Sequence, residues 1–91
     1  MEQMYIGEQR RMKIYQAIKA ELDRASKLYP DWWQDMVYGA STAMEESGEA
    51  LKAVNDFALH KKGSIDEIRK EAIHSAAMWI RFLVETEKLW Q

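Results

Sequence analysis

The stretch from Ala72 to Val84 constrains the fold of this chain more than any other feature. Its only polar side chains are His74, Ser75 and Arg81. A helix that is apolar on nearly every side must be covered on most of those sides in the folded protein. Two companion helices from one chain hardly provide that cover. The sequence therefore predicts a helical bundle with this segment at the centre of an oligomer, either a homodimer or a homotetramer.

The single proline of the chain divides a first helix from a second. Helical spacing of apolar residues predicts a first helix from about Gly7 to Leu28, and Pro30 disfavours its continuation. Asp31 is then expected to cap a second helix that extends to about His60. The buried stripe of the first helix is expected at Tyr15, Ile18, Leu22, Ala25 and Tyr29.

A second boundary is expected in the turn that follows the second helix. Gly63 is suited to end that helix, and Ser64 to cap the next one. Because Glu67 follows Ser64 by three residues, the pair predicts a capping box. The third helix is then expected from about Ile65 to Lys88. No strand pattern or internal repeat competes, so the sequence predicts one all-α domain that comprises residues 1–91, with three long helices per chain.

Composition excludes several classes of function. The chain has 13 basic and 15 acidic residues, for a net charge of −2. No extended basic face is present, so duplex nucleic acid is not expected as a partner. The absence of cysteine excludes disulfides and thiolate chemistry, and it fits a reducing compartment. No apolar run reaches the length of a signal peptide or of a membrane span. We therefore expect a cytoplasmic protein that has no contact with a membrane.

Two short acidic clusters lie within otherwise apolar sequence. Glu45, Glu46 and Glu49 belong to the second expected helix, whereas Glu71 and His74 belong to the third. The last two acids of the first cluster are three residues apart, as are the two members of the second, so each pair lies on one side of its helix. Carboxylates that converge on an apolar seam repel one another and are costly to desolvate unless a cation neutralises them. If the two helices are antiparallel, the two clusters face each other. The sequence then predicts a divalent metal site between them.

The same residues resemble the signature of a known family. Glu45-Glu46-x-x-Glu49, followed after 21 intervening residues by Glu71-x-x-His74, is similar to the EExxE…ExxD signature of the MazG-like, all-α nucleoside triphosphate pyrophosphohydrolases. The similarity extends over most of the chain. Chance spacing of glutamates on helices produces parts of such a pattern, so its specificity comes from the two clusters together.

The resemblance implies a hydrolase that cleaves a nucleoside triphosphate to the monophosphate and pyrophosphate with Mg²⁺. Carried over by position, the metal ligands of the family match Glu46, Glu49 and Glu71. Its assisting catalytic acid matches Glu45. The fourth ligand position departs from the signature, because His74 stands where the family has Asp. Mg²⁺ prefers oxygen ligands and imidazole suits softer ions, so a site that includes His74 makes Mn²⁺ a second candidate cofactor.

Basic side chains are the expected contacts for the phosphates of a substrate. They are Lys52, Lys61, Lys62 and Arg81, and spacing singles out none of them. His74 on an apolar face also fits a hydrogen-bonded packing residue that binds no metal. In that case the alternative function is a non-catalytic helical module on the same scaffold, which binds a nucleotide or assembles with its own copies.

Overall fold

The computed structural model describes residues 5–90 of the chain. Helix α1 comprises Ile6–Leu28, α2 Met36–His60 and α3 Ile65–Glu87, and a 3₁₀ turn, η1, follows at Lys88–Trp90. Within these residues there is no strand, which confirms the all-α class. In the same part of the chain, none of the helices combines the length and the apolar composition that a bilayer crossing requires.

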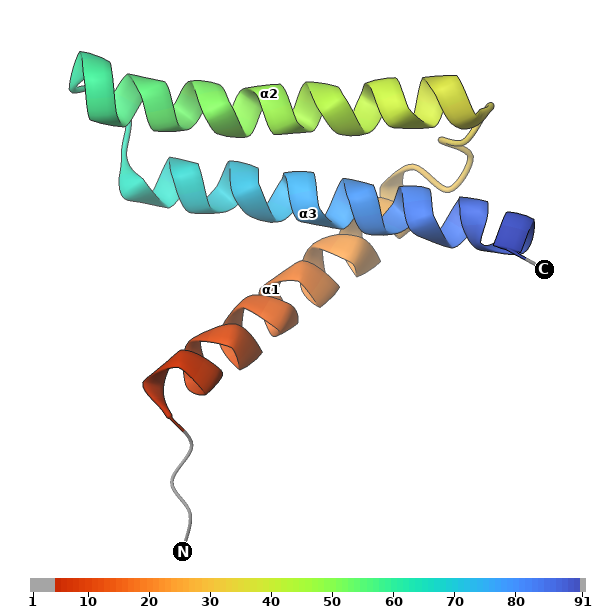
Figure 1. The fold of residues 1–91 in the computed structure, drawn as a ribbon, viewed down its shortest axis with the longest axis horizontal. Coiled ribbons are helices and arrows are strands. Elements are labelled where there is room, and N and C mark those ends of the chain that lie inside the picture. Colours follow the sequence, from red (N-terminus) through yellow and green to blue (C-terminus); the bar gives the residue numbers. More distant parts are fainter. Residues whose placement is uncertain (1–4, 91) are drawn as a thin grey trace, which may run out of the picture.

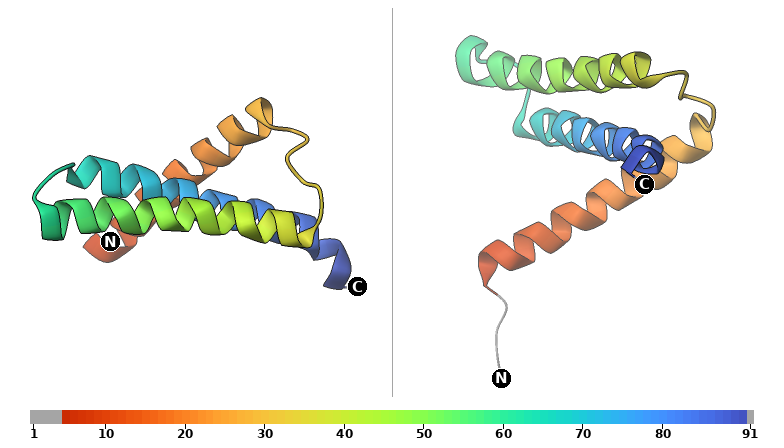
Figure 2. Two further views of the ribbon diagram at one scale, coloured as in Figure 1. Left: turned by 90° about the horizontal axis from the view of Figure 1, so that it is seen from above. Right: turned by 45° about the vertical axis from the view of Figure 1, so that its right-hand side comes forward.

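The three helices form a hairpin with one oblique arm. Helices α2 and α3 lie antiparallel and side by side, and α1 crosses α3 near its own C-terminal end (Figure 1). The right-hand view in Figure 2 shows α1 diverging from the hairpin toward its N-terminal end. Among the described residues, α1 brings no Cα atom within 8 Å of α2. Helix α3 is therefore the central element of the single chain, and its predicted place at the centre of an oligomer stays a prediction.

The connection between α1 and α2 corrects one expected boundary. Helix α1 ends at Leu28 as expected, but Asp31 does not cap α2. The cap is Asp35, whose carboxylate accepts a hydrogen bond from the backbone N–H of Tyr38 at 2.8 Å. Residues 32–35 are not helical. The longer connection lets the indole of Trp33 pack across the start of α2, which a residue within that helix could not do.

The turn between α2 and α3 lies where the sequence predicts it. Ser64 caps α3 and accepts a hydrogen bond from the backbone N–H of Glu67 at 3.1 Å. Helix α2 ends at His60, as expected, but the left-handed residue that follows directly is Lys61, with φ of 53°. Gly63 is also left-handed, with φ of 78°. The glycine therefore completes the turn and does not end the helix, which corrects the expected C-cap.

The seam between α2 and α3 is made of small residues. Its buried members are Ala43, Ala53 and Ala77. A polar contact joins the same two helices, because Oγ of Ser47 lies 2.8 Å from Oγ of Ser75 and accepts a hydrogen bond from the indole N–H of Trp79 at 3.0 Å. Small side chains let the two helix axes approach closely, and the serine pair satisfies its own hydroxyl groups and the indole N–H of Trp79.

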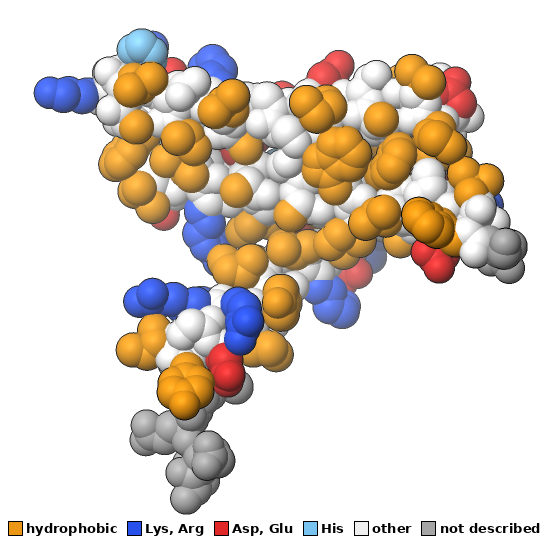
Figure 3. All heavy atoms as spheres, in the orientation of Figure 1, with side chains coloured by type: hydrophobic (Ala, Val, Ile, Leu, Met, Phe, Trp, Pro, Cys, Tyr) orange, Lys and Arg blue, Asp and Glu red, His pale blue; other side chains and the backbone are white. Residues whose placement is uncertain are grey.

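Much of the expected core is open in the single chain. No large side chain among residues 5–90 is fully buried, and Ala25 is the only buried residue of the stripe expected on α1. On α2, Val37, Met44 and Leu51 lie at helical spacing and are 76%, 59% and 61% exposed. Figure 3 shows apolar side chains gathered over one face of α2 and α3. We call the residues that line its shallow groove the α2–α3 apolar face: Met36, Val37, Ala40, Met44 and Phe82.

Trp33 leaves no room for a side chain at Gly39. A Cβ atom at that position would lie 2.4 Å from Cζ3 of Trp33, and the indole also packs against the ring of Phe82, with centroids 5.8 Å apart. The Gly39→Ala variant gains about 1 kcal/mol of helix propensity. Overpacking of a confined ring costs roughly 1–3 kcal/mol, so we expect the melting temperature of this variant to fall.

The matched control is Gly48→Ala, on the same helix. Nothing lies within 4 Å of the atom that this substitution adds, so only the gain in helix propensity remains and the melting temperature should rise. Thermal unfolding followed by circular dichroism measures both variants. An equal rise for the two would mean that Trp33 moves aside freely and does not fix the start of α2.

Candidate metal centre

The hairpin brings three of the predicted metal ligands together. Glu46 of α2 and Glu71 and His74 of α3 each offer one ligand atom, and these atoms lie within 4.8 Å of one another. All three residues are half-buried. One turn of α3 carries both of its ligands on the same side, and the antiparallel pairing of the helices places Glu46 opposite them. Two clusters that are distant in sequence thus form one group of possible ligands.

The surroundings of Glu46 disfavour the ionised form of its carboxyl group. Burial raises the pKa of its carboxyl group above the ordinary value, and the negative charges of Glu49, Glu71 and Glu21 raise it further. His74 acts in the opposite direction. Because both burial and repulsion oppose the ionised form, a cation beside Glu46 would relieve both effects at once.

One oxygen of Glu71 is enclosed and unpaired. Its Oε2 atom has less than 1 Å² of accessible surface and no hydrogen-bond partner among the described residues. Buried carboxylate oxygens nearly always have a donor or a cation beside them, since an unsatisfied one loses its hydration without compensation. Two carboxylates and one imidazole suit Mn²⁺ better than Mg²⁺, which prefers an all-oxygen shell. The side chains present therefore fit a divalent cation.

Two acids of the signature lie outside this group. Glu49 is exposed, one turn along α2 from Glu46, and its charge contributes to the raised pKa of Glu46. Glu45 is exposed as well and lies at the rim of the groove along the α2–α3 apolar face. Helical geometry explains the division, because adjacent residues on a helix face different directions.

The lysines expected at substrate phosphates are dispersed. Lys52 forms an ion pair with Asp56, one turn further along α2, at 3.0 Å. Lys61 follows Glu46 by 15 residues, which corresponds to about 22 Å along the helix axis. Lys62 is its neighbour in the same exposed turn. Within one chain, the structure does not bring these lysines to the group of metal ligands.

The side chain of Arg81 is buried and contacts the connection between α1 and α2. It is 7% exposed, and its guanidinium group donates a hydrogen bond to the carbonyl oxygen of Tyr29 at 2.7 Å. The same group lies over the ring of Trp32, with Cζ 5.0 Å from the centroid. These contacts fasten the connection between α1 and α2 onto α3. Within one chain these contacts hold the fold together, and the substrate contact expected of Arg81 stays a prediction.

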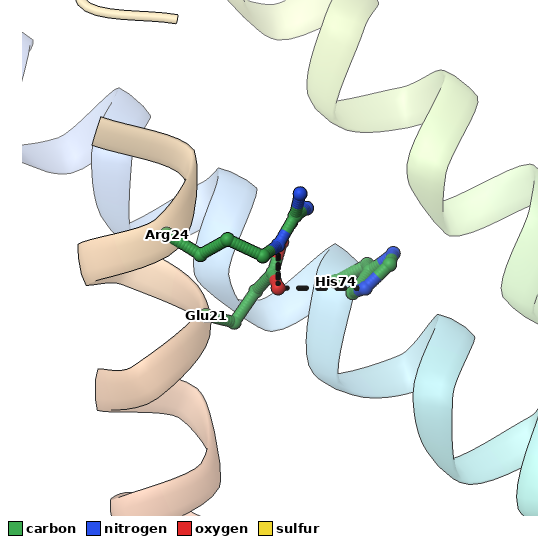
Figure 4. A network of polar contacts seen from close by, with 3 residues as sticks. All are labelled: Glu21, Arg24 and His74. Carbon is green, nitrogen blue, oxygen red and sulfur yellow. Dashed lines mark hydrogen bonds and ion pairs between the residues drawn. The ribbon is translucent and has the colours of Figure 1, made fainter. Parts of the chain in front are cut away.

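Glu21 of α1 is a member of the site that sequence analysis missed. Its Oε1 atom lies 3.5 Å from Nε2 of His74, and the carboxylate accepts two hydrogen bonds from Arg24, at 2.8 and 2.6 Å (Figure 4). The hydrogen bonds from Arg24 are the main reason that the pKa of Glu21 is below its ordinary value. The only sequence signal is an acid three residues before an arginine, which is common on solvated helices.

Comparison with known proteins leaves the family of this chain open. No family model, no curated protein and no solved structure matches it. The resemblance to the MazG-like signature therefore depends on the residues of this sequence alone, and membership of that family stays a prediction.

The Glu46→Gln variant tests how far the ionised carboxylate of Glu46 destabilises the metal-free protein. A raised pKa means that the folded protein binds a proton at Glu46 more readily than the unfolded chain does. Ionisation of Glu46 therefore destabilises the metal-free fold at pH values above its raised pKa. As the pH falls through this pKa, the carboxyl group takes up a proton and the destabilisation is lost. At neutral pH we expect Glu46→Gln to melt at a higher temperature than the wild type in the presence of a chelator.

The same variant should lose the stabilisation by metal. Mn²⁺ is expected to raise the melting temperature of the wild type, because a cation that binds only the folded state stabilises it. Glu46→Gln should show little of that rise, whereas Glu87→Gln, which removes an exposed carboxylate from α3, should keep it. Thermal unfolding with and without Mn²⁺ measures the effect. A full Mn²⁺ response in Glu46→Gln would exclude Glu46 as a ligand.

Proposed function

We propose that this chain is a metal-dependent nucleoside triphosphate pyrophosphohydrolase, which releases a nucleoside monophosphate and pyrophosphate. The observation that carries the proposal is the convergence of two carboxylates and an imidazole beside an enclosed, unpaired oxygen of Glu71. Phosphoryl transfer requires positioning and charge neutralisation more than covalent chemistry by the protein. A cation held at this site supplies charge neutralisation for the phosphoryl oxygens.

The acidic signature supports the same proposal. Glu46, Glu71 and His74 occupy three of the four positions that match metal ligands in the family the sequence resembles. Glu49, exposed and one turn from Glu46, is proposed as the fourth ligand, since residues three apart on a helix are neighbours on its surface. Glu45 takes the role of the assisting acid, which the resemblance alone assigns to it.

His74 is proposed to set the choice of metal. An imidazole in place of the fourth carboxylate favours Mn²⁺ over Mg²⁺, so wild type should release pyrophosphate faster with Mn²⁺. The His74→Asp variant completes an oxygen shell and should gain activity with Mg²⁺. A tenfold gain corresponds to about 1.4 kcal/mol of transition-state stabilisation. A pyrophosphate assay with mixed nucleoside triphosphates, run in each metal, measures both proteins.

The assay needs two further variants. Glu71→Gln removes the enclosed carboxylate and should reduce the rate by at least about a hundredfold in either metal. Glu87→Gln should retain the wild-type rate. Absence of pyrophosphate release by wild type and by His74→Asp in both metals would contradict the proposal and favour the non-catalytic helical module.

A homodimer or homotetramer is proposed as the functional form. The chain exposes 7276 Å², whereas a compact monomer of its mass exposes about 5,500 Å². Its radius of gyration is 15.5 Å, against about 12 Å for a compact domain of this length. The excess of exposed surface is larger than the roughly 800 Å² that each partner buries in a standard interface. The α2–α3 apolar face is the part of the described surface that a second copy would cover first.

Light scattering tests the assembly. At micromolar concentration the wild type should have at least the mass of a dimer. Val37→Glu places a charge on the α2–α3 apolar face and should shift the mass toward that of the monomer, because the charge would have to be desolvated in the interface. Lys13→Glu, on the diverging part of α1, is the control and should not change the mass. A wild-type monomer at this concentration would contradict the proposed assembly.

A further inference from the structure

We propose that Glu21 is a positioning residue that keeps the imidazole proton of His74 on Nε2 and thereby leaves Nδ1 free to bind a metal. The inference rests on the metal site of the proposed function and extends it to α1. The family signature that the sequence resembles lies on α2 and α3 only, so Glu21 is not part of it. Glu21 would act through His74 and not by contact with substrate.

The side chains of Glu21 and His74 lie close to each other. Oε1 of Glu21 lies 3.5 Å from Nε2 of His74, and Figure 4 shows the two side chains pointing toward one another from α1 and α3. A neutral imidazole carries one N–H and one lone pair, on nitrogens that face different directions. A carboxylate beside Nε2 favours the N–H there and leaves the lone pair on Nδ1. Such contacts are often long in an unloaded site and shorten when it is loaded.

Arg24 holds the carboxylate of Glu21 in place as a hydrogen-bond acceptor. Both of its oxygens accept hydrogen bonds from Arg24, one from Nε at 2.8 Å and one from Nη2 at 2.6 Å. The Glu21 side chain is 13% exposed. A carboxylate fixed by a guanidinium group stays ionised and keeps its orientation. The positive charge of Arg24 also disfavours a cation at Glu21, which separates this residue from the ligands themselves.

Without Glu21, the carboxylates of Glu46 and Glu71 would favour a different position for the imidazole proton of His74. A nitrogen of His74 lies within 4.8 Å of carboxylate oxygens of Glu46 and Glu71. In the metal-free protein these carboxylates attract the same proton. If the proton moved to Nδ1, the imidazole would donate a hydrogen bond to the carboxylates of Glu46 and Glu71. The lone pair would then lie on Nε2 and would point away from the metal. Metal-binding histidines generally give their other N–H to a carboxylate or a carbonyl for this reason.

The direct test is the tautomer of His74 in metal-free protein. Long-range ¹H–¹⁵N correlation spectra distinguish the two neutral tautomers from each other and from the doubly protonated ring, and a His60→Gln variant assigns the signals. Wild type should show the proton on Nε2. Glu21→Ala should shift the population toward Nδ1, and Glu21→Gln, which keeps an acceptor oxygen, should shift it less. Asp23→Ala removes a carboxylate that is paired with Lys19 on the same helix and should leave the tautomer unchanged.

Metal titration gives the second readout. Glu21→Ala should bind Mn²⁺ or Zn²⁺ about ten- to a hundredfold more weakly than wild type, and Asp23→Ala with wild-type affinity. The same tautomer in wild type and Glu21→Ala would overturn the positioning role, even if both proteins bind metal. A tautomer that switches in a protein that binds no metal supports the positioning role and counts against the proposed function, so the two failures are distinguishable.

Discussion

The close packing of α2 against α3 is the interaction on which the rest of the structure depends. Small residues line the seam, and Ala43 and Ala77 are almost completely buried there. Because these side chains are short, the helices approach closely enough for Glu46 to face Glu71 and His74. The packing that forms the hairpin therefore also creates the repulsion and desolvation that a cation would relieve. The residues of the candidate metal site therefore destabilise this seam in the metal-free protein.

The contact of α1 with α3 depends on a different set of interactions. Arg81 donates to the carbonyl of Tyr29 and lies over Trp32, so it joins the end of α1 and the following connection to the centre of α3. Glu21 reaches His74 because this joint sets where α1 crosses α3. Arg81, a predicted phosphate contact, thus influences the side chains around the candidate metal site through the placement of α1.

The open α2–α3 apolar face explains why so few large side chains are buried. A helix such as α3, with only three polar residues between Ala72 and Val84, needs neighbours on most sides. In one chain it has α2 on one side and part of α1 on another, and Leu83 and Val84 remain exposed. The exposed groove reaches Glu45 at its rim. An interface along this face would therefore lie close to the acidic residues of α2. Formation of the oligomer would then be coupled to the proposed metal-dependent reaction.

Local sequence signals are enough to predict the class of the fold and the ends of most helices. Pro30 excludes a helix that continues past α1, and Ser64 caps α3 through a hydrogen bond to a residue three positions away. These signals are local, so they can be read without a tertiary structure. The spacing of Glu71 and His74 is equally local, and together with an antiparallel hairpin it was enough to predict that they meet Glu46.

The tertiary structure decided what depends on contacts between distant residues. Asp31 and Asp35 are equally good caps by residue type, and the packing of Trp33 over Gly39 and against Phe82 accompanies the choice of Asp35. Glu21 joins His74 only because of the position at which α1 crosses α3, which no local pattern specifies. A helical pattern states which residues share a face, but the packing of side chains between helices decides what that face meets.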